Sequence, residues 1–71
     1  MDIEISDKHN MTREEAAELL HQVADTLARH NEVQFTRNGM KIRVDVPKQV
    51  LVEVEVELED DENSLEIEIT W

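Results

Sequence analysis

The sequence VLVEVEVELEDDENSLEIEITW, from Val50 to Trp71, contains two runs in which apolar and acidic residues alternate. A period of two is typical of a β-strand that has one buried face and one solvated face. The polar run 60–64 between the two runs has the composition of a turn. We therefore predict an antiparallel hairpin with one apolar face and one acidic face.

Matching the apolar residues of this hairpin sets Leu58 near Leu65 and Val52 near Trp71. The same register brings glutamates of the two strands directly opposite one another, and like charges in that position are destabilising. We therefore expect stability to rise with salt or bound cations, because screening weakens the repulsion. The glutamates of the acidic face are Glu53, Glu55, Glu57, Glu66 and Glu68.

An amphipathic helix is predicted over residues 13–30, N-terminal to the strands. Thr12 is placed as its N-cap, Glu15 three positions later completes a capping box, and Asn31 suits a left-handed C-terminal cap. Apolar residues recur at the spacing of one helix face, which indicates that this face is buried. They are Ala16, Leu19, Leu20, Val23, Leu27 and Ala28.

Another hairpin is predicted around Asn38-Gly39, between the helix and the acidic strands. These two residues accept the positive φ angles that a two-residue type I′ turn requires. Such a turn determines the register, and this register places apolar residues of both strands on one face. The pairs are Arg37 with Met40, Phe35 with Ile42, and Val33 with Val44.

Pro47 and Lys48 interrupt the alternation and predict a further turn. A turn centred on Lys48 would pair basic residues of one strand with glutamates of the next, namely Arg43 with Glu53 and Lys41 with Glu55. We therefore predict an α+β fold with one helix packed on one face of a four-stranded antiparallel meander sheet, in a single domain over residues 1–71. The alternation in Met1–Ile5 is compatible with a short extra strand or with a frayed terminus.

The composition restricts the function more than it identifies it. The 71 residues contain 18 Asp and Glu against 7 Lys and Arg, a formal net charge of −11, and no cysteine. This charge disfavours direct binding of nucleic acid and of anionic membranes, and the lack of cysteine excludes disulfides and thiolate metal sites. No run is apolar enough for a signal peptide or a membrane span, so we expect a cytoplasmic protein. The acidity also fits a high-salt environment.

Three segments together resemble the Amphi-Trp domain family of small prokaryotic proteins. They are TREEAAELLHQVADTL from Thr12 to Leu27, VPKQVLVEVEVE from Val46 to Glu57, and the terminal LEIEITW. The likeness covers nearly the whole chain. The resemblance implies a small domain of unknown function and supplies no reaction, ligand or catalytic residue. Asn38-Gly39 and the three histidines are not part of the family pattern.

Trp71 is the most distinctive candidate residue. Its position in the alternation matches Leu65, Ile67 and Ile69, which favours a core position that closes one end of the apolar face. The alternative is a partly exposed anchor for a binding partner.

Two groups of polar residues are weak candidates for a metal site. Glu18, His21 and Asp25 share one helix face and offer an imidazole and two carboxylates, although no fourth ligand is evident. The turn residues Glu59, Asp60, Asp61 and Glu62 concentrate carboxylates without the ligand spacing of an EF-hand loop. A solvated polar surface is the favoured interpretation of both groups, and no cofactor is predicted.

The sequence carries no arrangement of a nucleophile and a base, and no glycine-rich phosphate loop, so we predict that the protein is not an enzyme and takes no small-molecule substrate. We expect an interaction or accessory domain that binds a protein partner or itself as a homodimer. The alternative is an acidic module that binds cations or imitates the phosphates of DNA.

Overall fold

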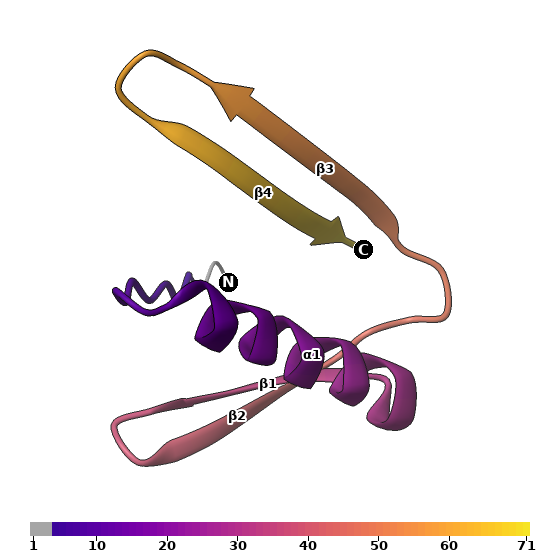
Figure 1. Cartoon of the computed structure of the whole chain (residues 1–71). Helices are drawn as coiled ribbons and strands as arrows, with labels where there is room; N and C mark the ends of the chain where they lie inside the picture. The colour runs from indigo at the N-terminus through magenta and orange to yellow at the C-terminus, as the bar shows by residue number, and fades with distance from the viewer. Residues whose placement is uncertain (1–3) are drawn as a thin grey trace.

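The computed structural model describes residues 4–71, which form one helix and four strands in two antiparallel hairpins (Figure 1). The α+β class is therefore confirmed. Residues 4–12 precede the helix without regular secondary structure, and Met1–Ile3 lie outside the described residues, so only Glu4 and Ile5 of the predicted extra strand can be judged. The elements in chain order are α1 (Arg13–His30), β1 (Glu32–Arg37), β2 (Met40–Asp45), β3 (Leu51–Leu58) and β4 (Asn63–Thr70).

Helix α1 has the predicted bounds because its two ends are capped as the sequence indicates. The Glu15 backbone N–H donates to Thr12 Oγ1 at 3.1 Å, and the Thr12 backbone N–H donates to Glu15 Oε1 at 3.2 Å. Asn31 follows the helix with φ 54° and ψ 37°, the left-handed conformation of a C-terminal cap. Thr12 and Glu15 thus satisfy two backbone donors at the N-terminus of the helix, and Asn31 ends the helix at its C-terminus.

Replacing Thr12 by alanine tests the contribution of this cap. We expect T12A to lower the free energy of unfolding by about 1 kcal/mol, because the Glu15 N–H loses its acceptor. Urea unfolding followed by circular dichroism at 222 nm measures the effect. T12S keeps the hydroxyl and is expected to unfold near the wild-type midpoint, so equal midpoints for T12A and T12S would contradict the assignment.

The β1–β2 hairpin confirms the predicted register in every pair. Asn38 and Gly39 both have positive φ, 51° and 75°, as the two-residue turn requires, and Phe35 lies opposite Ile42. The Val46 backbone N–H donates to the Asn31 carbonyl at 2.8 Å and extends the same ladder by one pair beyond the strand. This bond ties the start of the connecting segment 46–50 to the end of α1.

The β3–β4 hairpin is confirmed as a hairpin, but its predicted register is wrong by two residues. Val52 lies opposite Ile69, and Val56 lies opposite Leu65. Trp71, the predicted partner of Val52, therefore lies one residue beyond the end of β4. A shift by two keeps every side chain on its predicted face, since the side-chain period is two. The glutamates therefore still meet across the strands, as Glu53 with Glu68 and Glu55 with Glu66.

The prediction of a single four-stranded sheet is not confirmed. β1 pairs with β2 and β3 pairs with β4, in two separate two-stranded sheets. The predicted pairs of Arg43 with Glu53 and of Lys41 with Glu55 are absent from the described residues.

The registers of the two hairpins explain why β2 and β3 do not pair in this way. In the β1–β2 hairpin, the hydrogen bond from Val46 to Asn31 shows that the backbone N–H and C=O groups of even-numbered β2 residues point toward β1. The backbone groups of Lys41 and Arg43 therefore point away from β1, toward the free edge of β2. In the β3–β4 hairpin, the Glu59 N–H donates to the Glu62 carbonyl at 3.1 Å, so the backbone groups of odd-numbered β3 residues point toward β4. The free edge of β3 is therefore formed by the residues between them, Val52, Val54 and Val56.

Antiparallel strands form hydrogen bonds only between opposed residues that both point at the partner strand. Pairing β2 with β3 would thus set Arg43 opposite a valine and not opposite Glu53. Opposed residues share a face of the sheet, so the apolar faces of the two hairpins would lie on opposite sides. One helix could not cover both of them.

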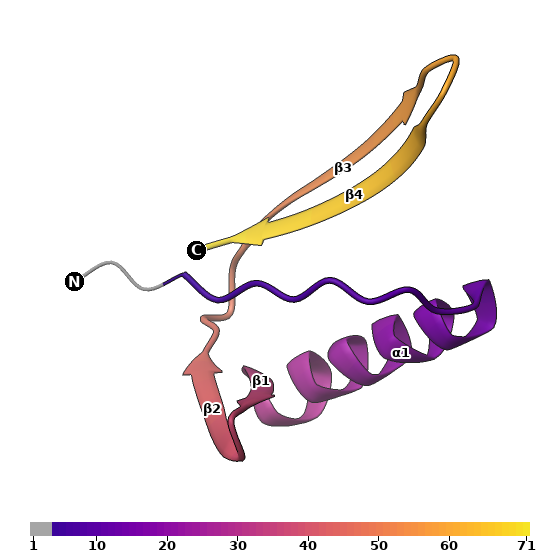
Figure 2. The same cartoon turned by 90° about the vertical axis from the view of Figure 1, so that its left-hand side faces the viewer.

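The helix lies beside β1, and the second hairpin projects away from both (Figures 1 and 2). No residue in the described part of the chain is fully buried, so the predicted packing of the helix over a four-stranded sheet is not observed. The radius of gyration is 14.0 Å, whereas a compact chain of this length has about 11 Å. A single copy of the chain is therefore open.

Candidate interaction surface

The apolar face of the β3–β4 hairpin is lined by large hydrophobic side chains, most of which are exposed to solvent. Period-two alternation places these residues on one side of the two strands, where cross-strand partners such as Val54 and Ile67 stand directly opposite. Val54 is 63% exposed and Leu65 is 61% exposed. We call this surface the apolar hairpin face; it consists of Val52, Val54, Val56, Leu58, Leu65, Ile67 and Ile69.

No other helix or strand among residues 4–71 contacts this hairpin. Sequence reasoning placed these side chains in a core because alternating valine and glutamate predicts one buried side. The alternation identifies which side of the hairpin is apolar, but it does not identify what covers that side. The candidate surface that the sequence interpretation missed is therefore the predicted core itself.

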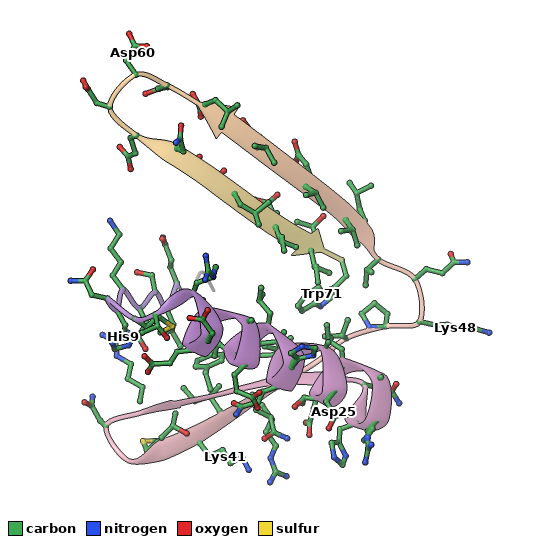
Figure 3. All side chains as sticks on the ribbon, in the orientation of Figure 1. His9, Asp25, Lys41, Lys48, Asp60 and Trp71 are labelled. Atoms are coloured by element: carbon green, nitrogen blue, oxygen red, sulfur yellow. The ribbon has the colours of Figure 1, made fainter. Side chains whose placement is uncertain are left out.

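Trp71 continues the apolar hairpin face at the end of β4. Its side chain points from the hairpin toward the side on which α1 lies (Figure 3), but it remains 55% exposed. The predicted core position is thus not observed in the single chain. The alternative, a partly exposed anchor for a binding partner, stays a prediction.

The opposite side of the hairpin is acidic, as predicted. Glu53, Glu55, Glu57, Glu66 and Glu68 share this side, with two glutamate pairs directly across the strands. Asp60 lies at the tip of the hairpin (Figure 3). No Lys or Arg occurs between residues 51 and 71, so the hairpin contains no basic residue to balance these carboxylates.

The predicted metal candidates lie on exposed surfaces. Glu18, His21 and Asp25 line one shallow depression on α1, but Arg29 Nε lies 2.8 Å from Asp25 Oδ1 and engages that carboxylate. Glu59 and Glu62 line a hollow with residues of the acidic side, while Asp60 and Asp61 do not. Within residues 4–71, no three His, Asp or Glu side chains converge in a way that could hold a metal ion.

A small hollow separates α1 from β1. It measures about 230 Å³ and is lined by Leu19, Val23 and Phe35 among others. This is below the 300–1,000 Å³ typical of ligand pockets. The hollow indicates loose packing between the helix and the first hairpin, and the helix retains apolar residues that are half exposed, Leu19 and Leu20, each at 50%.

Helix α1, as described, lacks the length of apolar sequence needed to cross a membrane. The family model for the Amphi-Trp domain matches residues 1–71. Among the curated proteins and the solved structures that were compared, none matches the chain.

Proposed function

Because the chain belongs to the Amphi-Trp domain family, we propose that it acts by binding protein through its apolar hairpin face, and not by catalysis. The observation that carries this proposal is that the face is exposed while no element of the described chain contacts the hairpin. Isolated two-stranded hairpins are marginally stable in water. A protein that covers this face stabilises the hairpin and removes a surface that favours aggregation.

The chemistry of the face defines its partner. The surface is aliphatic with one terminal tryptophan and contains no charged side chain, whereas the reverse side is a row of carboxylates. A partner surface that is apolar at its centre would complement the apolar hairpin face. A basic rim on that partner would complement the glutamates of the acidic side.

Photo-crosslinking in cells of the native host tests whether protein covers this face. The variant Val54→p-benzoylphenylalanine places the photoreactive group on the apolar face, and Glu55→p-benzoylphenylalanine places it one residue away on the acidic side. We expect irradiation to produce a protein adduct from position 54 and several-fold less from position 55. Both positions are exposed, so neither replacement disturbs a packed core.

Equal adduct yields from positions 54 and 55 would show that the apolar side is not preferred. A complete lack of adducts from position 54 would show that no protein covers it. Either result would overturn the proposed function.

A second candidate function is supported by the glutamate pairs of the acidic side. Glu53 lies opposite Glu68 and Glu55 lies opposite Glu66, an arrangement whose repulsion is relieved by bound cations or by a basic protein. We place this role after the first, because water and salt already solvate an exposed acidic surface, whereas an exposed aliphatic surface remains unfavourable in any aqueous medium.

A further inference from the structure

The exposed area of the single chain matches what a dimer would bury. The chain exposes 7079 Å², whereas a compact protein of 8.3 kDa exposes about 4,600 Å². The excess is about 2,500 Å² per chain, part of which belongs to the extended N-terminal segment. If two copies bury most of this excess, the interface falls in the range of roughly 2,000–5,000 Å² found in obligate homodimers.

The distribution of charge determines which surfaces of two copies can meet. Nine of the 18 acidic residues lie in residues 51–71 without any Lys or Arg, whereas all 7 basic residues lie between Lys8 and Lys48. Two acidic hairpins therefore repel one another. The helix and the first hairpin carry nearly balanced charge, so they accept the acidic hairpin of another copy at much lower electrostatic cost.

We propose that two copies of the chain exchange their β3–β4 hairpins, so that the apolar hairpin face of each copy packs on the apolar side of α1 of the other. This inference rests on the proposed function and names the partner. The exchange covers two exposed apolar surfaces of each chain at once, the hairpin face and the side of α1 that carries the half-exposed Leu20, which does not line the hollow toward β1. The glutamates stay in solvent on the outer side.

The connecting segment 46–50 is suited to this exchange. Its first residue is held to the helix end by the 2.8 Å bond from the Val46 N–H to the Asn31 carbonyl, and Pro47 restricts the backbone directly after it. From there the chain leads the hairpin away from its own helix (Figures 1 and 2). Exchange of an identical element between copies is a low-cost route to a dimer.

Native mass spectrometry and light scattering of the purified chain test the proposal. At 100 µM we expect twice the chain mass of 8.3 kDa. V54D breaks the hairpin face and L20D breaks the helix face; each alone is expected to weaken the dimer at least roughly a hundredfold, because each buries an unpaired charge twice. A mixture of V54D and L20D is expected to restore a mixed dimer, since one of its two hairpin–helix contacts is intact.

Matched controls add the same charge on the other side of each element. T70D lies on the acidic side of the hairpin and H21D lies beside Leu20 on an exposed helix position. Both are expected to remain dimeric. Circular dichroism shows whether α1 is retained in V54D and L20D, so loss of the dimer can be separated from loss of folding.

Three results would overturn the exchange. Dimers of L20D as stable as the wild type would show that the hairpin packs elsewhere. A monomer whose hairpin amides exchange rapidly with deuterium would exclude self-association, and the proposed function would then stand if position 54 still crosslinks another protein. A monomer with protected hairpin amides would mean that the hairpin closes on its own helix, and both proposals would fail.

Discussion

Diluting the protein about a hundredfold is expected to lower its melting temperature by roughly 5–10 °C. If the folded state is a dimer, dilution destabilises it by about 2.8 kcal/mol, since each factor of ten in concentration corresponds to about 1.4 kcal/mol. A folded unit of two such chains shifts by roughly 2–4 °C per kcal/mol. Differential scanning fluorimetry of Trp71, the one tryptophan of the chain, follows the transition at both concentrations.

The control for this dilution experiment is L20D, whose melting curve, cooperative or not, is expected to be independent of concentration because this variant is already monomeric. A wild-type melting temperature that does not change between 2 µM and 200 µM would contradict a dimeric folded state. It would instead require a core within the single chain, for which no buried residue is observed among residues 4–71.

The features that sequence reasoning predicted correctly are those determined by neighbouring residues. The helix begins and ends where Thr12, Glu15 and Asn31 cap it, because capping bonds span at most a few residues. The register of the first hairpin follows from Asn38-Gly39 alone. These features depend only on residues close together in the sequence, so they can be predicted without knowing the rest of the structure.

The second hairpin shows where alternation stops being informative. Val52 pairs with Ile69 and not with Trp71, but both registers have the same apolar face and the same opposed glutamates. In the observed register the turn is closed by a backbone hydrogen bond from the Glu59 N–H to the Glu62 carbonyl. A run of acidic residues contains no turn-specific residue such as Gly at the required position, so the pattern alone could not select the register.

The missing four-stranded sheet has a related cause. Which backbone groups face the free edge of a strand depends on how its own turn closes, and this property does not appear in the order of apolar and polar residues. Charge matching of Arg43 with Glu53 indicated an attractive pair without testing whether the hydrogen bonds of β2 and β3 could form. The acidic side of the candidate surface was placed correctly, while the exposure of Val54 and Ile67 depends on tertiary contacts that the alternation does not encode.

Changing Glu55 to lysine is expected to stabilise the protein by about 1 kcal/mol at low salt. Glu55 lies directly opposite Glu66, so the substitution replaces a repulsive pair by an attractive one. In 1 M NaCl the difference between E55K and the wild type is expected to shrink to a few tenths of a kcal/mol, because the Debye length falls to about 3 Å. Urea unfolding in 20 mM and in 1 M NaCl measures both values.

The control E57K makes the same change in net charge on the same side of β3, but Glu57 lies opposite Ser64 and not opposite a carboxylate. We expect E57K to gain less than half as much as E55K at low salt, because it reduces only the general negative field of the hairpin. Equal gains for E55K and E57K would show that the opposed pairs contribute nothing beyond the net charge. The wild type itself should become more stable between the two salt concentrations, and a midpoint that does not change would remove the electrostatic strain that we assign to the glutamate pairs.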